Sequence, residues 1–112
     1  MSKNVLLVED DVFFVSLLKS KLTALNYEVT AMESSIGVLK YLNEKKPDIV
    51  LLDIALPGIS GFEILGEIKL KPELNNIPII LVSSLSQESD IKTGLDLGAV
   101  AYFTKNQQNI HQ

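Results

Sequence analysis

Two short apolar segments, residues 5–8 and 49–52, each run directly into carboxylate side chains. The carboxylates that follow them are Glu9, Asp10 and Asp11 after the first segment and Asp53 after the second. Two unit charges about 4 Å apart repel by about 4 kcal/mol at an effective dielectric of about 20. A fold that gathers these acids therefore needs a cation among them or a raised pKa. The pattern indicates a site for a hard metal ion around one special aspartate.

The elements that position these acids can be read from the apolar pattern. A continuous apolar run bounded by charge is typical of a buried strand in a parallel sheet, and such sheets bind ligands at the carboxyl ends of their strands. The pattern predicts strands at residues 4–9, 27–32, 48–53, 77–83 and 100–104. It predicts helices at residues 12–25, 61–70 and 87–97, and another that Ser34 or Ser35 caps and that ends before Pro47. This alternation predicts a doubly wound parallel α/β sheet.

Composition limits the classes of protein that fit. A chain of 112 residues is expected to form one domain, and no apolar run is long enough to span a membrane. The first four residues lead directly into the first strand, so we expect no signal peptide. Cysteine is absent, which fits the cytoplasm. All ten basic residues are lysine and the net charge is −4, so direct binding of nucleic acid is not expected.

The polar residues at the strand ends match the pattern of a known family. They are Glu9-Asp10, Asp53, Pro57, Gly61, Ser83-Ser84, Gly98-Ala99, Tyr102 and Lys105. With these residues in this order, the chain resembles the receiver domain of bacterial two-component response regulators. The resemblance implies a flavodoxin-like, five-stranded parallel sheet with strand order 2-1-3-4-5.

The resemblance also implies a role for each polar residue. Asp53 would be the phosphoacceptor, with Ser83, Ser84 and Lys105 binding the phosphoryl oxygens. Ser83 and Tyr102 would form the conformational switch. The Mg²⁺ ligands would be Glu9, through water, together with Asp10, Asp53 and the backbone carbonyl of Ala55.

Some of these residues also have simpler interpretations. Asp11 is expected to cap the first helix and not to bind the metal. Ser83 can be an ordinary hydroxyl at a strand end, and Tyr102 can be a core residue. The four apolar residues at 12–15 exceed one core stripe, so they provide either a docking surface for a partner helix or additional core.

The chain departs from the family after Lys105. The family has proline at the next position, preceded by a cis bond, whereas this chain has Asn106. A cis bond costs about 2.5–4 kcal/mol before a residue other than proline, so the bond is either trans or strained. Residues 105–112 are too short and polar for a fifth helix and are predicted to form a truncated or disordered tail of a single receiver domain, 1–112. Apolar side chains of Leu6, Val8 or residues 100–103 would then stay partly bare, and a homodimer is expected to cover them.

These observations predict a Mg²⁺-dependent signalling switch that catalyses only its own phosphorylation and dephosphorylation. Its partner would be a sensor histidine kinase or a phosphotransfer protein. The main alternative is a receiver-like interaction module that works without phosphorylation. A phosphatase of the haloacid dehalogenase type would need a second acid two residues after Asp53, where this chain has Ala55. A flavodoxin would have to place its phosphate at acidic residues 9–11, which repel it.

Overall fold

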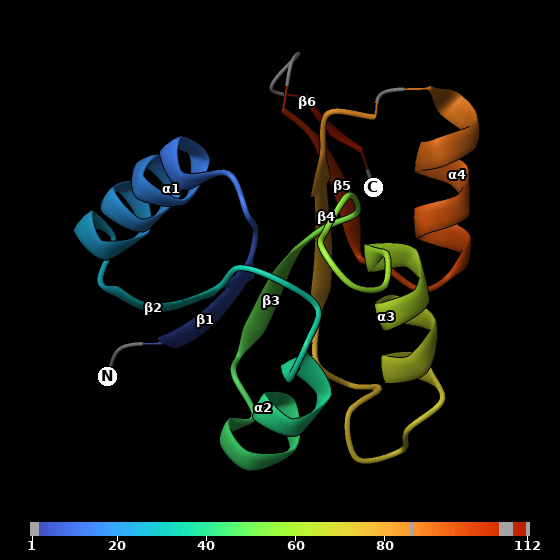
Figure 1. The fold of residues 1–112 in the computed structure, drawn as a ribbon, viewed down its shortest axis with the longest axis horizontal. Helices are drawn as coiled ribbons and strands as arrows, with labels where there is room; N and C mark the ends of the chain where they lie inside the picture. Colours follow the sequence, from blue (N-terminus) through green and yellow to red (C-terminus); the bar gives the residue numbers. More distant parts are fainter. Residues whose placement is uncertain (1–2, 86, 106–108, 112) are drawn as a thin grey trace.

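Figure 1 shows the computed structural model, which describes residues 3–85, 87–105 and 109–111 as one sheet with helices on both faces. The strands are β1 (Lys3–Val8), β2 (Tyr27–Met32), β3 (Ile49–Asp53), β4 (Ile79–Ser83), β5 (Ala101–Thr104) and β6 (Asn109–His111). The helices are α1 (Val12–Ala24), α2 (Val38–Lys45), α3 (Gly61–Lys69) and α4 (Glu88–Asp96). None of the described helices is long and apolar enough to cross a bilayer.

The strand order is β2-β1-β3-β4-β5-β6, and β1 to β5 are parallel. This confirms the predicted flavodoxin-like order of five parallel strands, and no helix follows β5 in the described part of the chain. The sequence analysis did not anticipate β6, which pairs antiparallel with β5 and extends the sheet by one strand. The predicted departure at the Lys105–Asn106 bond lies outside the described residues.

The helix starts depend on local hydrogen bonds. The prediction that Asp11 caps α1 is confirmed, because its Oδ1 accepts the backbone N–H groups of Phe13 and Phe14 at 3.0 and 3.2 Å. The prediction that Ser34 or Ser35 caps the next helix is wrong. That helix, α2, begins at Val38 after Gly37, which has a φ of +83°. The Ser35 side chain instead bonds to a different loop.

The main core lies between the sheet and the helices α2, α3 and α4, on the opposite face from α1 (Figure 1). Leu6 and Val8 of β1 belong to this core and are fully buried. The expectation that these two side chains would be bare is therefore wrong. Because side chains alternate along a strand, the α1 face receives Leu7 instead, and this residue is also buried.

The α1 face of the sheet is covered less completely. A groove of about 260 Å³ opens there, lined by Phe14 and Leu18 of α1 and by Leu51, Ile80, Val82, Ala101 and Phe103 of the strands. No residue of α1 is fully buried. Two of the residues expected to be bare, Ala101 and Phe103, do line this groove, although Ala101 is itself only 4% exposed.

Candidate functional site

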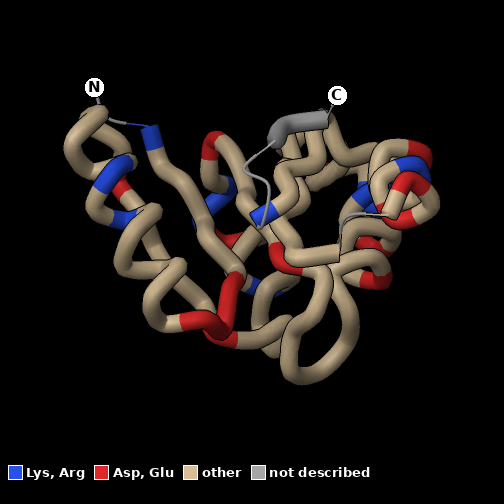
Figure 2. The backbone as a smooth tube through the Cα atoms, turned by 90° about the horizontal axis from the view of Figure 1, so that it is seen from above, with Lys and Arg blue, Asp and Glu red and all other residues tan. Residues whose placement is uncertain are grey.

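The carboxyl ends of β1 and β3 bring the acidic residues together, as the sequence predicts. Figure 2 shows acidic residues gathered where β1 leads into α1. Glu9, Asp10 and Asp53 each offer a carboxylate oxygen, and these atoms all lie within 4.8 Å of one another. Glu9 and Asp53 are buried, at 1% and 5% exposure, whereas Asp10 is exposed. The remaining acid, Asp11, is used as the cap of α1.

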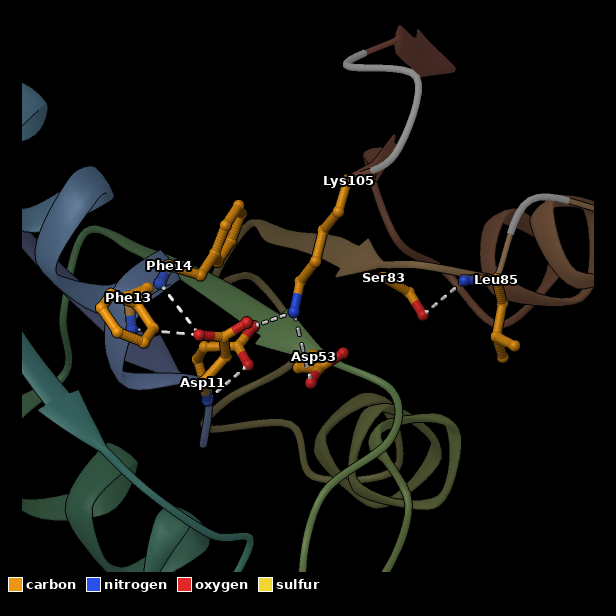
Figure 3. Close-up of polar contacts among 8 residues, drawn as sticks. Asp11, Phe13, Phe14, Asp53, Ser83, Leu85 and Lys105 are labelled. Atoms are coloured by element: carbon orange, nitrogen blue, oxygen red, sulfur yellow. Dashed lines mark hydrogen bonds and ion pairs between the residues drawn. The ribbon is translucent and has the colours of Figure 1, made fainter.

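Lys105 lies across this acidic cluster (Figure 3). Its Nζ is 2.6 Å from Glu9 Oε1 and 3.7 Å from Asp53 Oδ2, so the shorter ion pair is with Glu9. The same Nζ lies 4.5 Å from the centre of the Phe14 ring, a distance typical of a cation–π contact. Lys105 follows β5, where its backbone N–H donates to the Ser83 carbonyl at 2.8 Å. This bond fixes the point from which the lysine side chain reaches the acids.

Burial raises the pKa of Asp53 from 3.8 to about 6, and the negative charge of Glu9 adds to the shift. Lys105 opposes the rise in this pKa because its positive charge favours the carboxylate form. The Asp53 carboxylate is thus poorly stabilised by its surroundings, although it is mostly ionised at neutral pH. An ionised, incompletely neutralised carboxylate can act as a nucleophile or bind a cation.

The donor set fits a divalent cation that prefers oxygen. The three carboxylates supply only oxygen atoms, which suits Mg²⁺ or a similar hard ion. Glu9 Oε2 accepts the Asp11 backbone N–H at 3.0 Å. The other oxygen, Oε1, is buried and has no hydrogen-bond partner among the described residues, although it lies close to the Lys105 ammonium group. A buried carboxylate oxygen without a well-aligned donor is a suitable metal ligand or outer-sphere acceptor.

The last residue of β4, Ser83, supplies a hydroxyl group to the site. Ser83 is 1% exposed, and its Oγ accepts the Leu85 backbone N–H at 3.1 Å (Figure 3). The Leu85 carbonyl in turn accepts the Tyr102 hydroxyl at 2.7 Å. Tyr102 is fully buried, and this burial raises its pKa. Ser83 and Tyr102 therefore hold the same residue of the loop after β4.

The remaining predicted site residues lie in the loops around this cluster. Ala55 is exposed, two residues after Asp53, and Ser84 is an exposed residue directly after β4. Sequence reasoning did not identify two further contributors, Phe14 and Ser35. The ring of Phe14 lies under the Lys105 ammonium group. Ser35 bonds to the loop that follows Asp53. The only sequence signal for Phe14 was its place on the apolar side of the predicted helix at residues 12–25, within the apolar run 12–15.

Comparison with known proteins agrees with this fold and site. The family model of the response regulator receiver domain matches residues 5–112. The chain is 37% identical over 105 residues to the response regulator PleD of Caulobacter vibrioides, covering 94% of this chain but only 23% of PleD. It is 33% identical over 105 residues to the polar-differentiation response regulator DivK of Brucella ovis, covering 94% of this chain and 85% of DivK.

Two solved structures are similar over most of the chain. The phosphorylated cyanobacterial phytochrome response regulator RcpA is 32% identical, with a TM-score of 0.87 and coverage of 94% of this chain and 81% of RcpA. The Mn²⁺-bound response regulator Rcp1 is 29% identical, with a TM-score of 0.84 and coverage of 92% and 81%.

The fold and the acidic site are those of the receiver domain found in response regulators of two-component signalling. The chain belongs to the response regulator receiver domain family. Receiver domains act as signalling switches that interact with histidine kinases or phosphotransfer proteins.

Proposed function

We propose that this chain is a phosphoacceptor switch in which Asp53 receives a phosphoryl group from a phosphohistidine of a sensor kinase or phosphotransfer protein. The observation that carries the proposal is the Asp53 carboxylate. It is almost fully buried at the carboxyl end of β3, its pKa is raised to about 6, and a lysine and two further acids surround it. Membership of the receiver family supports the same reaction.

In the proposed reaction an Asp53 oxygen attacks the phosphorus atom while the bond from phosphorus to the histidine nitrogen breaks. The imidazole leaves with the bonding electron pair and takes up a proton, and Asp53 carries an acyl phosphate. Lys105 needs only a small movement to pair with a phosphoryl oxygen, since its Nζ is already 3.7 Å from Asp53 Oδ2. The protein thus supplies the nucleophile and the positive charge from two different strand ends.

Mg²⁺ is the ion that we propose for this site, where it would neutralise the phosphoryl oxygens. Glu9, Asp10 and Asp53 would hold it, together with the backbone carbonyl of Ala55. The all-oxygen cluster and the buried Glu9 Oε1 support this assignment. The manganese ion named for the related Rcp1 structure supports a divalent cation in this family.

Ser83 and Tyr102 are the proposed switch. The Ser83 hydroxyl now accepts the Leu85 N–H, so a move of its Oγ toward the phosphoryl group would give up that bond. The Leu85 carbonyl would then be free to shift together with the Tyr102 hydroxyl that it holds. Phosphorylation at Asp53 would in this way change the loop between β4 and α4, which is a surface that a partner can read.

The direct test is incubation with acetyl phosphate and Mg²⁺ followed by intact-mass measurement. The wild-type protein is expected to gain one phosphoryl group, and Asp53→Asn is expected to gain none. A wild-type protein that stays unmodified under these conditions, with Mg²⁺ shown to bind, would instead favour an interaction module that works without phosphorylation.

A homodimer is the proposed partner for the groove on the α1 face. The groove is lined by Phe14 and Leu18, and the residues directly before them, Phe13 and Leu17, are exposed at 88% and 50%. Helix α1 therefore carries exposed apolar side chains next to the apolar groove that it forms with the sheet. In an isologous pair, the exposed Phe13 and Leu17 of each copy would meet the groove of the other. Exposed apolar surface of this kind favours self-association.

Light scattering over a range of protein concentrations tests the dimer. The wild-type protein is expected to dimerise as its concentration rises, and Leu17→Glu is expected to stay monomeric. The matched control is Leu70→Glu, which adds the same charge at an 83%-exposed leucine directly after α3, on the other face of the sheet. A wild-type protein that is monomeric at high concentration, or equal dimerisation of both variants, would rule out this interface.

A further inference from the structure

The loop that leaves Asp53 is held in place by a serine from a distant part of the chain. Ser35 lies between β2 and α2 and is 6% exposed. Its Oγ accepts the Ile59 backbone N–H at 2.8 Å and donates to the Pro57 carbonyl at 3.2 Å. The Ser35 backbone N–H donates to the same Pro57 carbonyl, also at 3.2 Å. Three hydrogen bonds therefore tie one buried residue to the loop after β3.

The backbone between these bonds is shaped to receive the serine. Gly58 has a φ of +93°, a conformation that favours glycine, and a Cβ at this position would collide with Ser35 Oγ. The loop is closed at its far end by the Gly61 N–H, which donates to the Ile54 carbonyl at 2.8 Å. A Cβ at Gly61 would collide with the Asp53 carbonyl oxygen. The loop is thus held next to Asp53 by the bond between Gly61 and Ile54, and at residues 57–59 by the bonds to Ser35.

We infer that Ser35 is a positioning residue for the cation site, acting through the loop of residues 54–60. This inference rests on the proposed function, in which the Ala55 carbonyl is a ligand, and Ala55 lies two residues before the Pro57 that Ser35 holds. A loop that is already ordered loses less conformational entropy when an ion binds to its backbone. Ser35 touches neither the acids nor Lys105 in any described contact, so its effect on the ion passes through the loop.

The neighbouring serine provides a matched control. Ser34 lies in the same loop, and its Oγ accepts only a local hydrogen bond among those described, from the Ile36 N–H at 3.2 Å. Ser34→Ala and Ser35→Ala each remove one hydroxyl from the β2–α2 loop. Only the second removes the two side-chain hydrogen bonds to the loop after Asp53, and it leaves the bond from the backbone N–H of residue 35 to the Pro57 carbonyl in place.

Calorimetric titration with Mg²⁺, well below the unfolding temperature, measures the effect. Ser35→Ala is expected to bind Mg²⁺ about three- to tenfold more weakly than the wild type, the range that corresponds to the net contribution of about one neutral hydrogen bond. Ser34→Ala should bind as the wild type does, and Ser35→Thr, which keeps the hydroxyl, should recover most of the loss. A serine that served only the fold would lower the unfolding temperature without changing the Mg²⁺ dissociation constant, and that result would overturn the inference.

Amide hydrogen exchange of the wild-type protein without metal gives a second, independent measurement. The Ile59 amide is expected to be protected, because the Ser35 hydroxyl accepts its N–H. Exchange of this amide at the rate of an unfolded chain would overturn the inference even if Ser35→Ala could not be folded. Failure of the wild-type protein to bind Mg²⁺ would instead refute the proposed metal site itself, so the two failures are distinguishable.

Discussion

Replacing Asp53 with asparagine should stabilise the metal-free protein at neutral pH. The folded protein holds the pKa of Asp53 at about 6, compared with 3.8 for the unperturbed group. Each pKa unit corresponds to about 1.4 kcal/mol, so ionising Asp53 in the fold costs about 3 kcal/mol. Asparagine keeps the shape of the side chain and carries no charge. We therefore expect Asp53→Asn to raise the free energy of unfolding by about 2–3 kcal/mol at about pH 7.5.

The pH dependence gives the sign of the effect. Because its pKa is higher in the folded protein, Asp53 binds a proton more tightly there than in the unfolded chain. Its contribution to stability is complete below the unfolded pKa of 3.8 and is lost as the pH rises through about 6. The advantage of the variant should therefore be small near pH 4 and reach its full size above pH 6. Other groups that titrate in the same way in the wild type and in Asp53→Asn contribute equally to the two free energies of unfolding, so they cancel in the difference between them.

Urea unfolding at a series of pH values, in the presence of a chelator, measures this difference. Glu44→Gln is the control, because it removes one negative charge from an exposed position in α2. It is expected to change stability by less than about 0.5 kcal/mol at every pH. Equal stability of Asp53→Asn and wild type at pH 7.5, or a gain that does not depend on pH, would mean that the charge of Asp53 is already well compensated in the fold.

Two further predictions concern the metal ion and the lifetime of the phosphorylated state. Millimolar Mg²⁺ should raise the melting temperature of the wild type by binding the folded state, and Asp10→Asn should reduce that rise; an unchanged melting temperature in wild type would count against the metal site. The resemblance to receiver domains implies that the hydrolytic water passes beside the residues two positions after the phosphoacceptor Asp53 and two after Ser83, which are Ala55 and Leu85. Neither side chain can orient water, so the phosphorylated form should be long-lived, and the double variant Ala55→Asn, Leu85→Glu should lose phosphate faster, by less than the 10²–10⁴-fold typical of acid–base catalysis. Equal loss of phosphate from both proteins, followed by intact mass, would contradict this.

The sequence predicted the acidic cluster because parallel strands bring their carboxyl ends to one edge of a sheet. Glu9, Asp10 and Asp53 follow from that rule alone, and the structure places them together. Asp11 was also interpreted correctly, because its spacing to α1 matches a helix cap. These predictions rest on interactions that are short in sequence or fixed by sheet topology.

Predictions that depended on contacts between loops, or on which face a residue occupies, were less successful. Ser35 and Ile59 are 24 residues apart, and no local pattern reveals their hydrogen bond. The run at residues 5–8 is apolar throughout, so it lacks the alternation that would have separated the face of Leu6 from that of Leu7. Residues 109–111 carry little strand signal of their own, and their pairing uses the hydrogen-bonding edge that β5 presents.

The position of Lys105 explains how the site is balanced before any phosphoryl group arrives. The formal charges of Glu9, Asp10, Asp53 and Lys105 sum to −2, which a single divalent cation neutralises. The ammonium group lies closer to Glu9 than to Asp53, at 2.6 against 3.7 Å, and only partly offsets the rise in the Asp53 pKa. A cation held by the carboxylates would weaken the pull of Glu9 on the lysine, because it shares the same negative charge. Lys105 would then be freer to turn toward Asp53, so that cation binding would prepare both the proposed nucleophile and its positive partner.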